Sequence, residues 1–425
     1  MNYRERDKKH LWHPLTQHGL DPDHLPIVRS AGSCLYDETG KAYIDGIASW
    51  YTCMYGHCNP QITARVKQQL DQLDQVVFSG FTHPPAIELS EKLVSILPDG
   101  LAKIFFSDNG STSVDVAIKM ALQFHFNRGA RKNQIIALDN AFHGDTFGAM
   151  SVSGLSVYNG PFEEFLLEVK RIPVPDKTNI GEVKKTLEAY LKSGEVAAFI
   201  FEPLVQGAAA MHMYEARHLD QLMHLSSEYG ALNIADEVMT GFGKTGKNFA
   251  SEYLRSSPDI ICLSKSLTAG VAPMALTCCT EEVFEAFYGQ EISRGFFHGH
   301  TYSANPLSCA AAIAGIDLLQ SDEIQLAIER INQRHSSFDE RIKDHPMVER
   351  TRLLGVIFAL DLKAETERYG NLRDRLYRFF LEQGVFLRPL GNTIYLLPPF
   401  TISDEELSRI YESVLKCLEM LSHEG

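Results

Sequence analysis

Apolar residues along the middle of the chain follow two alternating patterns. Short runs rich in apolar residues occur at 103–106, 134–138, 197–201, 231–235 and 259–263, and runs of this length are typical of buried strands. At 62–73, 86–97 and 114–127 the apolar residues instead recur with helical spacing. Strands separated by helices predict an α/β fold with a mostly parallel sheet.

The first fifty or so residues and the last third of the chain differ in character from the middle. Short strands are expected at 33–37 and 42–45, and later at 356–360 and 394–396, with a helix at 372–383. We therefore expect three parts. They are an N-terminal segment, 1–55, that packs with the small domain; a large domain, 56–314; and a smaller α+β C-terminal domain, 315–425.

Side chains also predict where two helices begin. Asn305-Pro306 predicts a helix start, because proline is favoured at the first helical position. Ser403 and Glu406 have the spacing of a capping box. The apolar residues after them fall on one stripe of the predicted final helix: Leu407, Ile410, Tyr411, Val414 and Leu418.

Charge and composition exclude several classes of protein. The net charge of −14, from 40 basic and 54 acidic side chains, argues against a nucleic-acid-binding surface. No apolar run approaches the roughly 18 residues of a membrane span, and the first ten residues lack the apolar stretch of a secretory signal. The eight cysteines contain no CxxC pair, which favours reduced thiols. We expect a cytoplasmic protein that acts on small molecules, without nucleic-acid or membrane partners.

A carboxylate and an amine follow two of the predicted strands. The run 231–235 ends at Asp236 and Glu237, and the run 259–263 is followed by Ser264 and Lys265. In an open α/β sheet, ligands bind outside the carboxyl ends of the strands, so Asp236 and Lys265 should face one cleft. A lysine that forms a Schiff base and an aspartate that pairs with a pyridinium nitrogen are the groups that pyridoxal phosphate requires of its protein.

Three further features have both a functional and an ordinary interpretation. The segment 107–112 joins a strand to a helix. It is either a phosphate-binding site, in which Gly110 lets the phosphate approach the backbone, or an ordinary helix cap. Phe142 follows a strand and is either a face that stacks on a flat ring or a core residue. Arg388 either clamps a substrate carboxylate or is a surface arginine.

Two motifs match known ligand-binding patterns only in part. The segment 241–246 matches G-x-G-x-x-G, but it lies past the middle of the chain, and two acidic residues precede it where a pyrophosphate would bind. His298 and His300, with His143 elsewhere in the chain, lack a third and fourth ligand at a recognisable spacing. We therefore expect no dinucleotide site at this loop and no bound metal.

The segment 235–246, followed by Ser264-Lys265-Ser266-Leu267, resembles the signature of class III pyridoxal-phosphate aminotransferases. The likeness extends over nearly the whole chain. It implies the α/β architecture of fold type I, with a large domain around a mostly parallel sheet, and a homodimer whose active sites lie at the subunit interface. Within this class, the stretches 11–14, 45–50, 140–151 and 388–396 resemble the branch that aminates 8-amino-7-oxononanoate in biotin biosynthesis.

The resemblance also implies roles for residues in the cofactor site. Lys265 would hold the cofactor as a Schiff base, and Asp236 would pair with its ring nitrogen. Its phosphate would be bound by Gly110 and Ser111, and by Thr301 of the other subunit with His300 beside it. The substrate site would be lined by Trp50, Phe142, Gly299 and Arg388, with Asp145 at a position that the family uses in recognition.

This chain departs from the usual pattern of that branch at several positions. Leu15 replaces a tyrosine that would face the adenine of S-adenosylmethionine, and Phe142 replaces another tyrosine. His300 and Lys244 stand where proline and arginine are usual. The donor is therefore expected to be S-adenosylmethionine, with lysine as an alternative.

Three rival functions remain open at this point. One is another class III aminotransferase that acts on ω-amino acids with pyruvate. The second is a nicotinamide-dependent oxidoreductase that uses the glycine loop at 241–246. The third is a catalytically silent binding protein with the same fold.

Overall fold

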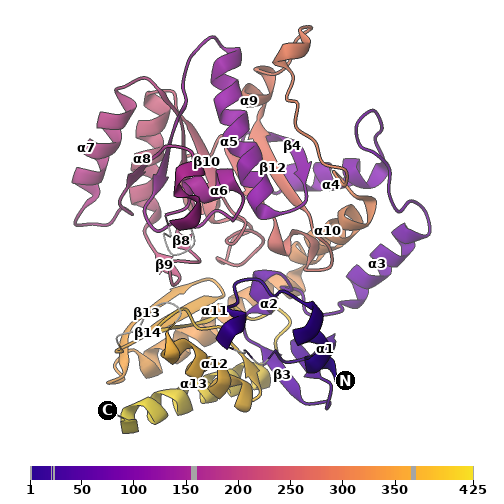
Figure 1. Ribbon diagram of the computed structural model, residues 1–425, viewed down its shortest axis with the longest axis vertical. Helices are drawn as coiled ribbons and strands as arrows, with labels where there is room; N and C mark the ends of the chain where they lie inside the picture. The colour runs from indigo at the N-terminus through magenta and orange to yellow at the C-terminus, as the bar shows by residue number, and fades with distance from the viewer. Residues whose placement is uncertain (1, 21, 23, 155–159, 365–369, 425) are drawn as a thin grey trace.

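The computed structural model describes residues 2–20, 22, 24–154, 160–364 and 370–424. Figure 1 shows a large sheet flanked by helices in the upper part and a smaller set of helices and strands below it. The beginning of the chain (indigo) and its end (yellow) both lie in the lower part. In the part of the chain that the structure describes, no helix has the length and apolar content needed to cross a membrane.

The upper part is built on a seven-stranded sheet. The order of its strands is β4 (Leu101–Ser107), β12 (Ala275–Thr280), β11 (Ile260–Leu263), β10 (Leu232–Asp236), β7 (Val196–Phe201), β5 (Gln134–Leu138) and β6 (Val169–Ile172). Strand β12 is antiparallel to both of its neighbours, and the other pairs are parallel. The predicted mostly parallel sheet is confirmed.

Both faces of this sheet are covered, which explains why the central strands β7, β10 and β11 are buried along their whole lengths. Ile135 packs in one buried cluster with α5 (Gly110–Asn127), whereas its neighbour Ile136 packs in a second cluster with α7 (Ile180–Leu191) and α8 (Ala216–Glu228). Successive side chains of a strand point to opposite faces. The helices on both sides leave the carboxyl ends of the strands as the open edge.

Asparagine side chains fix the starts of two helices that matter for the site. The Asn109 side chain accepts a hydrogen bond from the backbone of Thr112 (2.9 Å), so α5 begins at Gly110, four residues before the start that apolar spacing predicts. Asn305 caps α10 (Pro306–Leu319) in the same way. The start predicted from Asn305-Pro306 is confirmed, and in both cases the cap marks the boundary.

The N-terminal and C-terminal segments share a sheet in the lower part. Strands β1 (Ile27–Ala31), β2 (Cys34–Asp37) and β3 (Ala42–Asp45) pair in sequence, and β15 (Val385–Phe386) adds to β3 in parallel. A separate three-stranded sheet contains β13 (Val348–Leu354), β14 (Ile357–Leu362) and β16 (Thr393–Leu396).

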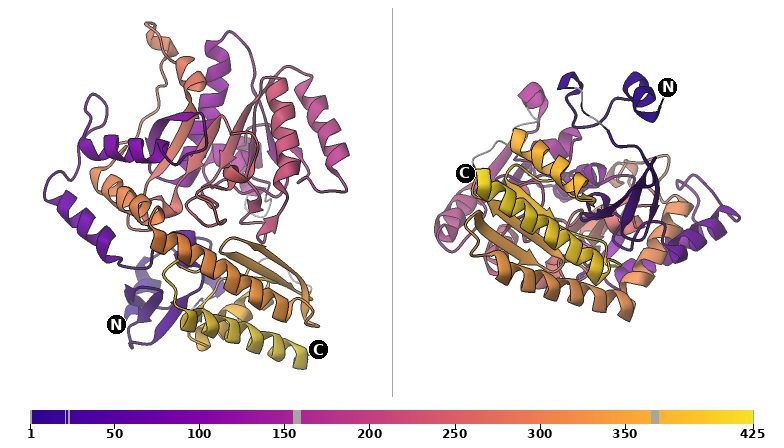
Figure 2. Two further views of the ribbon diagram at one scale, coloured as in Figure 1. Left: turned by 180° about the vertical axis from the view of Figure 1, so that it is seen from behind. Right: turned by 90° about the horizontal axis from the view of Figure 1, so that it is seen from below.

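Three helices pack around these small sheets: α11 (Asp322–Ile342), α12 (Asn371–Glu382) and α13 (Asp404–Glu424). Figure 2 shows α11 (orange) and α13 (yellow) along the lower part of the molecule. The predicted capping box is present, since Ser403 and Glu406 exchange side-chain and backbone hydrogen bonds of 2.9 and 3.1 Å. All five residues of the predicted stripe are buried.

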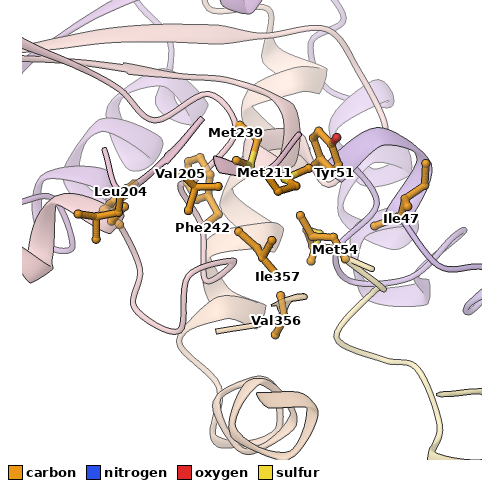
Figure 3. Close-up of a cluster of buried hydrophobic side chains, with 14 of the residues drawn as sticks. Ile47, Tyr51, Met54, Leu204, Val205, Met211, Met239, Phe242, Val356 and Ile357 are labelled. Carbon is orange, nitrogen blue, oxygen red and sulfur yellow. The ribbon is translucent and has the colours of Figure 1, made fainter. Parts of the chain in front are cut away.

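The helices predicted at 62–73 and 86–97 are present as α3 (Pro60–Leu70) and α4 (Pro84–Val94). Shorter elements include α1 (Tyr3–His10), α2 (Ala48–Tyr51), α6 (Phe147–Val152), α9 (Glu281–Glu285), the pair β8 (Val205–Gln206) and β9 (His212–Met213), and the 3-10 turn η5 (Lys265–Thr268). Figure 3 shows how distant segments share one core, in which buried side chains meet beside α2: Ile47, Met54, Met211, Phe242 and Ile357.

Candidate active site

Asp236 and Lys265 lie at the same edge of the large sheet. Strand β10 ends at Asp236, and the neighbouring parallel strand β11 ends at Leu263, two residues before Lys265. Both residues line one cavity of about 440 Å³. The expectation that the two strands deliver the carboxylate and the amine to one cleft is confirmed.

The Asp236 carboxylate is held in a fixed orientation. One oxygen, Oδ2, lies 2.7 Å from Nδ1 of the buried His143, and Oδ1 accepts a hydrogen bond from the backbone of Val238 (3.0 Å). The Asp236 side chain is 5% exposed, so this anion is nearly removed from water. A buried carboxylate with an imidazole partner can oppose a cationic group of a ligand.

The adjacent carboxylate, Glu237, binds protein groups in the loop after β10. It accepts hydrogen bonds from the backbone of Ala250 (2.9 Å) and Ser251 (2.6 Å), and from the Thr240 hydroxyl (2.7 Å). Burial raises its pKa, and these hydrogen bonds oppose that rise. Glu237 therefore organises the loop after β10, and only Asp236 of the pair lines the cavity.

Lys265 combines backbone strain with an enclosed amine. Its φ of 46° lies in the left-handed region, which a residue with a side chain occupies only where its surroundings hold it. Burial lowers the pKa of the amine, while the carboxylates of Asp236 and Glu202 oppose this effect. Nζ lies 5.8 Å from the centre of the Tyr51 ring. A lowered pKa increases the share of neutral amine, which is the nucleophilic form.

A second lysine, Lys244, lies behind Lys265 in the glycine-rich loop that follows Glu237. It is fully buried and donates a hydrogen bond to the Ser266 hydroxyl, which in turn donates to the carbonyl of Tyr51 (3.1 Å). Burial, and then the charge of Lys265, hold its pKa well below the ordinary value. Residues 241–246 do not line the cavity, and the loop contacts the segment of Lys265 through the hydrogen bond from Lys244 to Ser266.

Glu202 is a cavity residue that the sequence analysis missed. Its Oε1 accepts from the backbone of Phe142 and its Oε2 from that of Gly207, both at 2.9 Å, so it joins two loops of the cavity wall. Burial raises its pKa to about 7, with Asp236 adding to the rise and His143 opposing it. Glu202 directly follows the apolar strand β7, which is the same signal that marked Asp236.

The start of α5 forms another part of the cavity wall. Gly110 and Ser111 line the cavity, and the Ser111 hydroxyl accepts a hydrogen bond from the backbone of Asp145 (3.1 Å). A Cβ at Gly110 would lie only 2.8 Å from a methyl group of Val238, so a side chain does not fit there. Backbone N–H groups and the helix dipole at this end favour an anion such as phosphate.

An arginine and a tryptophan lie at the rim. The Arg388 guanidinium carbon lies 4.6 Å from the centre of the Trp50 ring. Both residues line the cavity, as do Leu15 and Arg373. The stacking on Trp50 restrains Arg388, and a restrained guanidinium is suited to a carboxylate.

The structure brings together most of the residues that the sequence singled out. The cavity is lined by Trp50, Gly110, Ser111, Phe142, Asp145, Asp236, Lys265 and Arg388. Gly299, His300 and Thr301 are not among its lining residues. His300 Nε2 instead lies 2.8 Å from Asp108, and the carbonyl of Thr301 accepts a hydrogen bond from the Gln75 side chain (2.9 Å).

The three histidines weighed as metal ligands each have another partner. His143 binds Asp236, His298 lies 2.9 Å from the Lys119 amine, and His300 pairs with Asp108. Within the described ranges, the group of three side chains whose donor atoms could surround an ion lies elsewhere, in the N-terminal segment: Asp7, His13 and His24.

Comparisons with known proteins agree with this site. The family model described as aminotransferase class-III matches residues 16–418. A protein named adenosylmethionine-8-amino-7-oxononanoate aminotransferase from Synechococcus elongatus is 42% identical, with 96% of this chain and 98% of that protein covered. The crystal structure of a protein of that name from Methanocaldococcus jannaschii superposes with a TM-score of 0.91 at 31% identity, covering 97% and 98%. An omega transaminase from Pseudomonas jessenii, in complex with PMP, superposes with a TM-score of 0.93 at 27% identity, covering 100% and 99%.

Proposed function

The chain belongs to the class III aminotransferases, which depend on pyridoxal phosphate, and from this premise we propose its substrates. We propose that it binds pyridoxal 5′-phosphate and transfers an amino group to 8-amino-7-oxononanoate, giving 7,8-diaminononanoate in biotin biosynthesis. The proposed donor is S-adenosylmethionine, with lysine as the alternative. The names of relatives that align over nearly their full lengths support this choice of acceptor.

The observation that carries the proposal is the pairing of Lys265 with Asp236 in one cavity. Pyridoxal phosphate needs an amine for its aldehyde, an anion for its ring nitrogen and an anion site for its phosphate. Lys265, Asp236 and the start of α5 at Gly110 offer these three groups. Phe142 and Val238 add apolar wall for a flat ring. The residues therefore fit the cofactor.

The bound cofactor would supply an aldehyde carbon that accepts amino groups and a cationic ring that withdraws electrons from the adjacent carbon. Lys265 would hold the cofactor through Nζ and, once displaced, would use the same atom to take a proton from Cα of the donor and deliver it to the C4′ carbon of the cofactor. Its lowered pKa keeps a share of the amine neutral for this task. Asp236, oriented by His143, would hold positive charge on the ring nitrogen.

Specificity for the acceptor would come from the rim of the cavity. 8-Amino-7-oxononanoate carries a carboxylate at one end, and Arg388, restrained by Trp50, would bind it. A carboxylate bound by two parallel N–H groups is fixed in orientation as well as in position. Leu15 and Phe142 make the wall apolar where the branch usually has tyrosines, which is why the donor needs a direct test.

We further propose that a homodimer completes the site. Gly299, His300 and Thr301 lie outside the cavity of their own chain, so these residues would serve the site of the other copy, with Thr301 at the cofactor phosphate. The large part, 56–314, would hold the cofactor, and the N-terminal segment 1–55 would pack with the small domain 315–425, as the shared sheet of β3 and β15 supports.

A donor screen on the purified enzyme tests the proposal. The cofactor absorbance should convert to that of the pyridoxamine form with S-adenosylmethionine or lysine, and 8-amino-7-oxononanoate should reverse the change. The Lys265→Ala variant, treated identically, is the matched control and should show no turnover.

The alternative function is that of an aminotransferase for ω-amino acids. The similarity in fold to the omega transaminase supports this alternative. Conversion by an ω-amine with reversal by pyruvate, combined with failure to rescue a biotin auxotroph that lacks the amination step, would establish that rival. Rescue by the wild-type gene and not by Lys265→Ala would support the proposed acceptor.

A further inference from the structure

Two imidazoles and a carboxylate meet in the N-terminal segment. Asp7 lies in the last turn of α1, and His13 and His24 come from the chain that follows. Each offers one donor atom, and these atoms all lie within 4.8 Å of one another. The right view of Figure 2 shows α1 (indigo, beside the N) at the outside of the molecule. None of the three is among the histidines that the sequence analysis weighed as ligands.

The contacts within this cluster are close. His13 Nε2 lies 2.9 Å from each carboxylate oxygen of Asp7. The rings of His13 and His24 are stacked, with 3.7 Å between their centroids and 25° between their planes. The side chains of His13 and Asp7 are 26% and 21% exposed. The protein therefore holds the donor atoms together, and a small ligand can still reach them from solvent.

A fourth histidine fixes the loop between two of these residues. His18 Nε2 accepts a hydrogen bond from the backbone N–H of His13 at 3.1 Å. The centroid of the His18 ring lies 5.9 Å from that of His13 and 6.4 Å from that of His24. Contacts that orient the ligands from outside are usual in metal sites. Because one ring nitrogen of His18 is used in this contact, we assign it a supporting role.

The donor atoms select the class of ion. Zinc in proteins is bound by imidazole nitrogens and carboxylate oxygens, and a site with three such ligands carries water in the fourth position. Mg²⁺ and Ca²⁺ instead prefer oxygen ligands throughout, so two imidazoles favour a transition metal. Neighbouring donors of a tetrahedral zinc site are about 3.3 Å apart. No pair of donors here is more than 4.8 Å apart, so small side-chain rotations bring them to that spacing.

We propose that Asp7, His13 and His24 bind a Zn²⁺ ion, with water as the fourth ligand, and that this ion anchors α1 and the adjoining wall of the cavity. His13 would bind through Nε2, the atom that already faces Asp7. Asp7 would bind through one carboxylate oxygen.

The stability of α1 should depend on this link. The helix has eight residues, and none of them is buried. An isolated helix of this length is marginal in water. An ion bound by Asp7 ties the last turn of α1 to His13 and His24. Local unfolding of α1 should become rarer as zinc binds, because the three ligands surround the ion only while the helix is formed.

The same ion would restrain one wall of the active-site cavity. Pro14 and Leu15 directly follow His13, and both line the cavity. Leu15 has a φ of 52°, and a residue with a side chain keeps this conformation only where its surroundings hold it. Fixing His13 should lower the cost of ordering this wall when a substrate binds. This step rests on the proposed function, whereas zinc binding and the anchoring of α1 do not.

Zinc titration of the metal-stripped holoenzyme, with a coloured chelator as competitor, tests the site. The wild type should bind one equivalent with a Kd of roughly 1 µM, weaker than a structural site with four protein ligands. Excess Mg²⁺ should not displace the zinc. His24→Gln should weaken binding by at least about 10-fold, since even the loss of an outer contact costs about 10–100-fold.

His224→Gln is the matched control. His224 is an exposed histidine that lies 3.3 Å from the carboxylate of Glu228, and no third ligand accompanies this pair among the described residues. This variant should bind zinc as the wild type does. Equal uptake by the wild type and His24→Gln would show adventitious binding to surface histidines only and would overturn the proposal. A wild-type Kd weaker than about 100 µM would overturn it without any variant.

Trypsin gives a measure of the anchoring that is independent of activity. Lys8 and Lys9 are exposed and follow Asp7 in α1, so cleavage after them requires the helix to open. With zinc at 100 times its Kd, this cleavage should slow by up to about 100-fold in the wild type and about 10-fold less in His24→Gln. Cleavage after Lys185, exposed on α7 at the far side of Figure 1, should not change. Equal cleavage of α1 with and without zinc would refute the anchoring.

Steady-state kinetics test the link to the cavity. Zinc should lower KM for the amino donor by about 2–10-fold in the wild type and in His224→Gln, with little change in kcat. In His24→Gln the same zinc concentration should have a smaller effect. A KM that zinc leaves unchanged in the wild type would refute this link. Zinc titration and proteolysis need no substrate, so failure of the proposed donor or acceptor is a separate result.

Discussion

Replacing Glu202 with glutamine should change how the stability of the protein depends on pH. Glu202 is fully enclosed, and its two oxygens accept one backbone hydrogen bond each, from Phe142 and Gly207. Glutamine has nearly the same shape and keeps one acceptor oxygen. Its NH₂ group faces the other N–H, so the variant loses one hydrogen bond at every pH, a constant cost of about 1–3 kcal/mol.

The pH-dependent part follows from the pKa of the carboxyl group. Burial raises it from an ordinary value of 4.5 to about 7, so the folded state binds the proton more tightly than the unfolded state does. The stabilisation is fully present below pH 4.5 and is lost as pH rises through 7. At 1.36 kcal/mol per pKa unit the whole effect is about 3 kcal/mol, of which about 2.5 kcal/mol falls between pH 5 and pH 8.

Urea unfolding of the cofactor-free wild type and of Glu202→Gln at pH 5 and pH 8 measures this effect. Groups that do not interact with Glu202 titrate identically in the two proteins, so their contributions cancel in the difference. The free energy of unfolding of the variant relative to the wild type should improve by about 2.5 kcal/mol between pH 5 and pH 8. The urea m-values should match between the two proteins, which checks that the comparison is valid.

If the free energies of unfolding of the wild type and Glu202→Gln change equally with pH, the pKa of Glu202 is not raised. A difference that changes by less than 1 kcal/mol over the same pH range would mean that Glu202 ionises like an exposed carboxyl. The wall joining the loops of Phe142 and Gly207 would then be open to water.

Four other substitutions, the last of them a control, give separate tests. Lys265→Ala should bind the cofactor without covalent attachment and lose at least about 10³-fold in kcat, measured by steady-state assay and by cofactor absorbance after gel filtration. Arg388→Lys should raise KM for the carboxylate acceptor by about 10–100-fold, because lysine cannot reproduce the two-pronged contact; an unchanged KM would remove Arg388 from the substrate site. Arg352→Met should lower the free energy of unfolding by about 3–5 kcal/mol, because it removes the buried partner of Asp361. Arg350→Met, which removes a more exposed partner of the same carboxylate, should cost under about 1 kcal/mol in the same urea assay.

Much of the large domain was predictable because its strands are buried on both faces. The run 197–201, and the run 259–263 after its first residue, are therefore apolar throughout, and the structure has β7 and β11 there. The ends of helices were less predictable where a capping side chain sets them, because that side chain is not part of the apolar repeat. Asn109 sets the start of α5 in this way. Strand β13 was missed because most of its residues are only partly covered.

The cofactor residues were predictable for a related reason. A polar residue at the end of an apolar strand must face either a ligand or a buried partner, and this rule identified Asp236 and Lys265. Applied once more, it would have found Glu202 after β7. His143 was considered only as a metal ligand, because nothing in the sequence shows that its partner is a carboxylate 93 positions further along the chain.

The left-handed turn of α2 could not be predicted from local sequence. Ala48 and Tyr51 have no preference for positive φ, and the conformation is imposed by partners such as Asp45 and Ser266. The contact with Ser266 joins segments far apart in the chain, because Ser266 lies 215 positions after Tyr51. Sequence patterns register local preference, and here tertiary contacts override it.

Borohydride reduction of the holoenzyme, followed by peptide mapping, tests whether Lys265 holds the cofactor. The reduced cofactor should remain attached to a single peptide, and the modified side chain should be Lys265, with Lys244, buried in the loop after β10, unmodified. Attachment at Lys244 or at another lysine, or release of all the cofactor as a free molecule, would contradict this expectation.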